Sequence, residues 1–128
     1  MNINEKLFTI AADHLMAQGV RSVKSTAGST TGMYHNSSCA YRGDNGTKCA
    51  IGCLIKDEFY SPGFENKTVV VDEVFEAVRK SCDPKPGETL DLELLDALQH
   101  IPDTYLPKDW RANLCQIASR FKYDWSPK

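Results

Sequence analysis

Apolar residues that recur every three or four positions place the strongest constraint on the fold of this chain. Such spacing puts side chains on one face of an α-helix. Near the amino terminus, Asn2 and Glu5 fit a capping box and Gly19 fits a C-terminal stop, so we expect a helix over residues 3–18. The apolar positions on its expected inner face are Ile3, Leu7, Ile10, Ala11 and Leu15.

Three further stretches in the second half of the chain show the same helical spacing. The first passes from β-branched residues into a helix with Asp72 as its candidate N-cap. The second has Asp91 in the same role, and the third carries Pro107 where a first-turn proline belongs. We expect these helices within residues 67–81, 90–101 and 106–125.

The middle of the chain carries a strong turn signal, the Gly-Asp-Asn-Gly sequence at residues 43–46. It predicts a short β-hairpin near residues 39–49, with Cys39 and Cys49 on its paired arms. The apolar run that follows, over residues 49–59, predicts a helix or a turn-rich helical segment. The expected fold class is mainly α (α+β), with four or five helices around one core and one short hairpin.

Length and charge narrow the classes further. A chain of 128 residues with 41% hydrophobic content fits one domain over residues 1–128, and its Ser/Thr/Gly-rich residues 21–38 predict a flexible loop. A net charge of -2 makes nucleic acid an unlikely partner. The amino terminus resembles no signal peptide and no stretch resembles a membrane span, so we expect a cytoplasmic protein.

Three cysteines and one histidine lie close enough in sequence to raise the question of a metal site. His35, Cys39, Cys49 and Cys53 offer the nitrogen and sulfur ligands that tetrahedral zinc takes. Cysteines inside an apolar run are more often small buried core residues, and we place that interpretation ahead of zinc. A disulfide from Cys39 to Cys49 or Cys53 is disfavoured in a reducing compartment. We therefore expect no cofactor, with zinc as the alternative.

No recognisable set of catalytic residues is present. Cys82 and Cys115 lie on or at the ends of apolar-faced helices, and neither His14 nor His100 stands in a nucleophile motif. A thiol-dependent enzyme is the second alternative. The first expectation is that the chain is not an enzyme.

Aromatic, arginine and acidic residues gather around the predicted loop, hairpin and turn. Aromatic and arginine side chains on loop-rich surfaces are typical of protein interfaces. The alternative is that Tyr41, Phe59 and Phe64 only cap the core. The candidate partner-binding residues are Tyr34, Tyr41, Arg42, Asp57, Glu58, Phe59 and Tyr60.

The stretch CAYRGDNGTKCAIGCLIKDEFY at residues 39–60 resembles a motif of small proteins encoded by tailed bacteriophages and prophages. The order of features in LLDALQHIPDTYLPKDWRANLCQIASRF, residues 94–121, is similar to the same family. Lys56 departs from that pattern, where a proline is expected. The family brings no activity with it. The resemblance implies a phage-encoded protein in the bacterial cytoplasm that binds and modulates or inhibits a host protein, such as a component of anti-phage defence.

Overall fold

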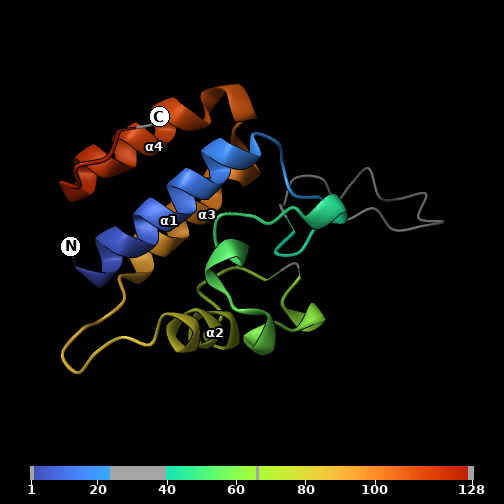
Figure 1. Cartoon of the computed structure of the whole chain (residues 1–128), viewed down its shortest axis with the longest axis vertical. Coiled ribbons are helices and arrows are strands. Elements are labelled where there is room, and N and C mark those ends of the chain that lie inside the picture. The colour runs from blue at the N-terminus through green and yellow to red at the C-terminus, as the bar shows by residue number, and fades with distance from the viewer. Residues whose placement is uncertain (1, 24–39, 66, 127–128) are drawn as a thin grey trace.

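A computed structural model describes residues 2–23, 40–65 and 67–126 of the chain, and the described part is mainly α-helical (Figure 1). This confirms the expected mainly α class. No β-strand occurs among the described residues. The helices are α1 (Ile3–Gln18), α2 (Asp72–Cys82), α3 (Leu92–Thr104) and α4 (Pro107–Phe121), and the 3-10 turns are η2 (Asp44–Gly46), η3 (Gly52–Leu54), η4 (Asp57–Phe59) and η5 (Pro62–Phe64).

The ends of the helices follow from their capping residues. The Asn2 side chain accepts a hydrogen bond from the Glu5 N–H at 2.8 Å, and Gly19 ends α1 with a left-handed φ of 68°. Asp91 caps α3, and Pro107 opens α4, as the sequence predicts. The Asp72 cap is wrong, because α2 begins at Asp72 itself. Its carboxylate then lies in the first turn of α2, where a negative charge stabilises the helix by its interaction with the helix dipole.

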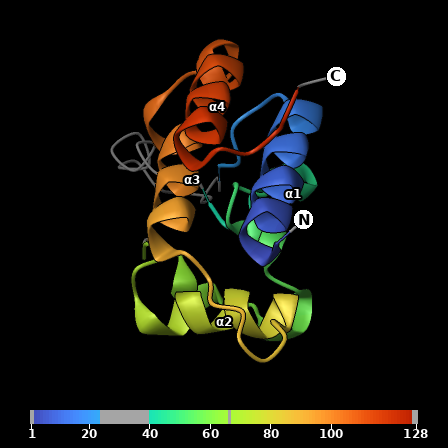
Figure 2. The ribbon, with the colours of Figure 1, turned by 90° about the vertical axis from the view of Figure 1, so that its left-hand side faces the viewer.

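The helices form two layers that share one buried cluster. Figure 2 shows the axes of α1, α3 and α4 roughly aligned, with α2 lying across one end of this group. The turn η3 contacts both α1 and α2 and so joins the two layers. No helix in the described ranges is long and apolar enough to cross a membrane. The largest fully buried side chains include Trp110, Tyr41, Phe8, Leu15, Ile51 and Val78.

The predicted hairpin near residues 39–49 is wrong, although its turn is present. The Gly43 N–H donates to the Thr47 carbonyl at 2.8 Å and closes a turn in which Asn45 and Gly46 have positive φ. The N–H groups of Tyr41 and Arg42 donate instead to a carboxylate, so they are not available for a strand ladder. The predicted loop residues 24–38 and Cys39 lie outside the described residues.

The apolar run over residues 49–59 takes the turn-rich form that the sequence leaves open. It consists of η3 and η4, joined through an extended residue at Ile55. The backbone of Gly52 lies against that of Tyr41, and a Cβ atom there would be only 2.2 Å from the Tyr41 carbonyl oxygen. The run is inward-facing, since Cys49, Ile51, Leu54 and Ile55 are buried.

Candidate functional site

Arg42, an expected partner contact, is largely committed to contacts inside the molecule. Its guanidinium donates hydrogen bonds to the carbonyl oxygens of Gly52 at 2.6 Å and Ile55 at 2.7 Å. It also pairs with the Asp57 carboxylate at 3.1 Å and lies over the Tyr60 ring, 4.7 Å from its centroid. The planar, multiply donating guanidinium suits this task. Arg42 therefore fixes the shape of the turn-rich segment.

Glu65 completes this network from the opposite side. Its two carboxylate oxygens accept hydrogen bonds from the backbone N–H groups of Tyr41 at 3.1 Å and Arg42 at 3.2 Å. The same carboxylate accepts the Tyr60 hydroxyl at 2.6 Å. Burial and then this hydrogen bond raise the pKa of Tyr60 to about 12, because both favour the neutral phenol.

Tyr41 is a core residue, and its predicted place on a partner-binding surface is wrong. Only 1% of its surface is exposed. Its hydroxyl donates to the Lys67 carbonyl and accepts from the Gln99 amide at 2.7 Å, while the Gln99 carbonyl accepts the Val69 N–H at 2.8 Å. Burial raises the pKa of Tyr41 well above that of a free tyrosine. This chain of hydrogen bonds ties the motif to α3.

The remaining predicted partner residues fall into two groups. Asp57 and Glu58 are exposed, whereas Phe59 and Tyr60 are half-buried against the core. Tyr34 lies outside the described residues. Of these five residues, only Asp57, Glu58 and the exposed parts of Phe59 and Tyr60 therefore lie on a surface that the structure describes.

The zinc alternative involves two cysteines that the structure describes and two ligands, His35 and Cys39, that lie outside the described residues. The Cys49 sulfur accepts the Gly52 N–H at 3.2 Å, and the Cys53 thiol donates to the Ala50 carbonyl at 3.1 Å. In the described part of the chain, no group of three His, Cys, Asp or Glu side chains is placed to hold a metal. The zinc site stays a prediction.

The thiol-enzyme alternative requires a cysteine that ionises easily. Burial instead raises the pKa of Cys53 to about 12, and burial also raises the pKa of Cys82. The rings of His14 and His100 hydrogen-bond to the backbone carbonyls of Lys48 and Asp96. Among the described residues, neither of these contacts joins a histidine to a thiol, and the thiol-enzyme alternative stays a prediction.

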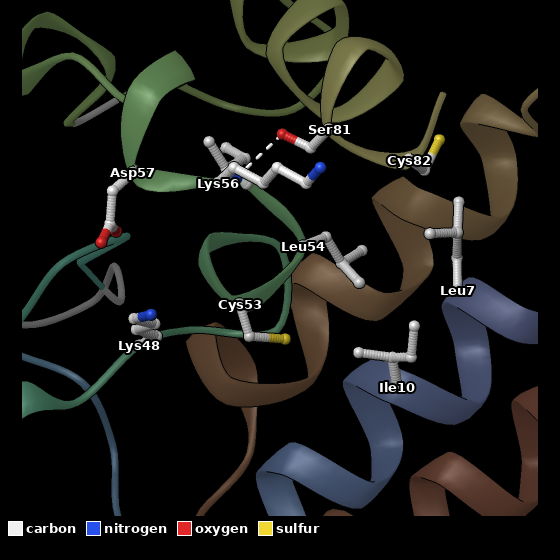
Figure 3. Close-up of a pocket in the computed structure, with 10 residues that line it drawn as sticks. Leu7, Ile10, Lys48, Cys53, Leu54, Lys56, Asp57, Ser81 and Cys82 are labelled. Atoms are coloured by element: carbon white, nitrogen blue, oxygen red, sulfur yellow. Dashed lines mark hydrogen bonds between the residues drawn. The ribbon is translucent and has the colours of Figure 1, made fainter. Parts of the chain in front are cut away.

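A surface groove lies where α1, the turn-rich segment and the end of α2 meet (Figure 3). Its volume is about 400 Å³. Figure 3 shows the side chains of Cys53 and Leu54 extending toward Leu7 and Ile10 of α1. Ile10 is 45% exposed, so the groove has an accessible apolar wall. Its polar lining consists of Lys48, Lys56, Asp57 and Ser81.

Hydrogen bonds from neighbouring side chains hold the backbone of Lys48 in place. The Gln18 amide accepts from the Lys48 N–H at 2.9 Å and donates to the Lys48 carbonyl at 3.0 Å. His14 Nε2 lies 2.8 Å from the same carbonyl oxygen. Because a carbonyl oxygen only accepts, Nε2 carries the proton. The position of Lys48 is thus fixed by α1.

Lys56 is held in a similar way by α2. Its N–H donates to the Ser81 hydroxyl at 2.8 Å, and that hydroxyl donates to the Ala77 carbonyl at 2.7 Å. The proline that the phage resemblance leads us to expect at this position would lack the N–H. The departure from the motif therefore coincides with a contact that shapes the groove.

Sequence reasoning missed the groove residues Ile10, Lys48, Lys56 and Ser81 as parts of a site. The sequence predicts Ile10 on the inner face of α1, and this prediction is wrong, because Ile10 is 45% exposed. One signal for its exposure is present in the sequence. On a helical wheel it lies at the edge of the apolar stripe, away from the side on which Ala11 and Leu15 are buried. No local pattern marks Lys48 or Lys56, because the contacts that place them come from Gln18 and Ser81, which are 30 and 25 residues distant.

Comparison of the chain with protein-family models, with curated proteins and with solved structures gives no match in any of the three. The resemblance to small phage proteins accordingly stays a prediction.

Proposed function

We propose that this chain is a non-catalytic protein that binds another protein through the groove between α1, the turn-rich segment and α2. One observation carries the proposal: an accessible apolar wall at Ile10 lies beside the charged side chains of Lys48 and Lys56. Protein interfaces combine an apolar centre with a polar rim in this way. The exposed Asp57 and Glu58 extend the same face.

The nature of the partner follows from the resemblance to phage proteins rather than from the geometry. On that basis, we propose that the protein is phage-encoded and acts in the bacterial cytoplasm on a host protein. Binding would modulate or inhibit that host protein, for example a component of an anti-phage defence system. Residues of the motif such as Tyr41 and Arg42 make their hydrogen bonds inside the molecule. These contacts keep the neighbouring surface rigid, which supports such binding.

Site-directed photo-crosslinking in bacterial lysate tests this proposal. A photoreactive amino acid at Glu58 reports on partners next to the groove. We expect one defined adduct, which Ile10→Asp abolishes because a charge on the apolar wall opposes burial. Leu106→Asp is the matched control, since Leu106 is also exposed but lies at the α3–α4 turn. An adduct that survives Ile10→Asp, or no adduct, would contradict the proposal.

A further inference from the structure

We infer that the groove binds an acidic, aliphatic segment of its partner, with carboxylates against Lys48 and Lys56 and an aliphatic side chain against Ile10. The inference rests on the proposed function and names the chemistry of the segment that the groove would take. Three features of the groove support it: the apolar lining, the charge balance and the fixed positions of the two lysines.

The shape and lining of the groove favour part of a chain over an enclosed small molecule. At about 400 Å³ the groove has room for a few side chains, and it is open to solvent. Leu54 and Ile10 supply apolar contacts from two different elements. The thiol of Cys53 adds a polarisable, uncharged surface between them, since burial keeps it protonated.

The charge balance of the groove selects an acidic occupant. Four Lys and Arg side chains of the described residues pair with carboxylates, as Lys67 does with Glu73, whereas others, such as Lys108 and Lys122, form no ion pair there. Neither Lys48 nor Lys56 forms an ion pair with any described residue. The one acid that lines the groove, Asp57, already pairs with Arg42. The groove therefore presents unneutralised positive charge beside an apolar wall, which complements an acidic, aliphatic segment.

The backbones of both lysines are fixed before any partner arrives. Gln18 and His14 hold Lys48, and Ser81 holds Lys56. Only the flexible part of each side chain remains to be ordered on binding. Such pre-organisation lowers the entropy lost when a partner binds, and it sets the spacing at which carboxylates would be recognised.

Fluorescence anisotropy with a defined probe tests the inference. The probe is a short fluorescein-labelled peptide in which glutamates flank a pair of leucines, and its control has glutamines in place of the glutamates. We expect the acidic peptide to bind the intact protein, the glutamine peptide to bind much more weakly, and added salt to weaken the acidic peptide. Equal binding of the two peptides would overturn the inference.

Variants assign the binding to the groove. We expect the double variant Lys48→Gln with Lys56→Gln to weaken the acidic peptide by about threefold to thirtyfold, the loss of two exposed ion pairs. The control Lys108→Gln with Lys122→Gln makes the same change in net charge on another face and should leave affinity within about twofold. Equal losses in the two double variants would show charge attraction without a site and would overturn the inference.

The outcomes separate this inference from the proposed function. If Ile10→Asp abolishes the photo-crosslink while the acidic peptide fails to bind, the groove binds a protein of other chemistry and only the inference falls. If the crosslink is also insensitive to Ile10→Asp, both fall. A dimer by light scattering that the peptide dissociates would indicate that a second copy occupies the groove, and this result also overturns the inference.

Discussion

Arg42 and Glu65 convert the most distinctive stretch of the sequence into an internal framework. Arg42 binds two carbonyl groups of the segment that follows it, and Glu65 binds two N–H groups of the segment that precedes it. Charged residues such as these two usually lie on the surface of a folded protein. Their charges are satisfied by the backbone and by Asp57, which explains how they can be largely withdrawn from solvent.

Loss of Glu65 tests this framework. We expect Glu65→Ala to lower the free energy of unfolding by about 1–3 kcal/mol, since the buried Tyr41 N–H loses its acceptor. Urea unfolding monitored by circular dichroism measures the change. The control Glu58→Ala removes an exposed carboxylate and should change stability by less than about 0.5 kcal/mol. Equal effects of the two substitutions would contradict the role given to Glu65.

The thiol of Cys53 gives a prediction about pH. Its pKa is raised by burial from 9.0 to about 12 in the folded protein. A raised pKa means that the stability it contributes is complete below pH 9 and is lost as the pH rises from 9 toward 12. We therefore expect Cys53 to react slowly with iodoacetamide up to the alkaline range, and the exposed Cys115 to react faster at neutral pH.

Mass spectrometry of the alkylated peptides reads out each cysteine separately. The same protein in urea provides the control, because all thiols should then react at similar rates. If Cys53 reacted fastest in the native protein at neutral pH, it would be an activated thiol, and a thiol-dependent enzyme would replace the non-catalytic binding protein as the proposed function.

Among the elements, helix positions could be predicted from the sequence and the middle segment could not. The boundaries of α1 follow from Asn2 and Gly19, which act within one turn of the residues that they cap. The predicted hairpin does not form, because the Tyr41 N–H donates to the Glu65 carboxylate, which lies 24 residues further along the chain. Periodicity reports local structure, and a carboxylate that captures backbone donors from such a distance leaves no periodic signal.

Gly52 tests the close packing of that segment. We expect Gly52→Ala to destabilise the protein by about 2 kcal/mol or more, because its Cβ would meet the Tyr41 carbonyl oxygen at 2.2 Å and must displace backbone. Gly63→Ala is the matched control, since the nearest atom to a Cβ there is the Ser61 hydroxyl at 3.5 Å. Thermal unfolding of both variants, compared at equal concentration, measures the difference. Similar melting temperatures would contradict the contact.

Across the whole molecule, one core joins the helical layer, formed by α1, α3 and α4, to the motif layer, formed by residues 40–65 and α2. Ile51 and Leu54 of the motif belong to the same buried cluster as Leu94 and Trp110 of the helices. Tyr41 and Gln99 add a buried hydrogen bond across the layers. Hydrophobic spacing predicts the helical layer from the sequence. It does not predict which face α2 covers, and the groove depends on that placement.

A shared core predicts cooperative unfolding. We expect the urea transition followed by tryptophan fluorescence, which reports on Trp110 in α4 and on Trp125 packed against Phe8, to coincide with the transition followed by labelling of Cys49 in the motif layer. The exposed Cys115 should label before the transition and serves as the control. Labelling of Cys49 at a clearly lower urea concentration would show that the motif layer unfolds separately.

Recognition of an acidic, aliphatic segment by the groove between α1, the turn-rich segment and α2 can be mapped residue by residue. The measurement is a titration of the isotopically labelled protein with the glutamate–leucine peptide, followed by its amide chemical shifts. We expect the largest shifts to cluster at Ile10, Lys48, Cys53, Lys56 and Ser81, which line the groove. Shifts centred on the α3–α4 face around His100 and Tyr105, or no saturable shifts, would contradict this recognition.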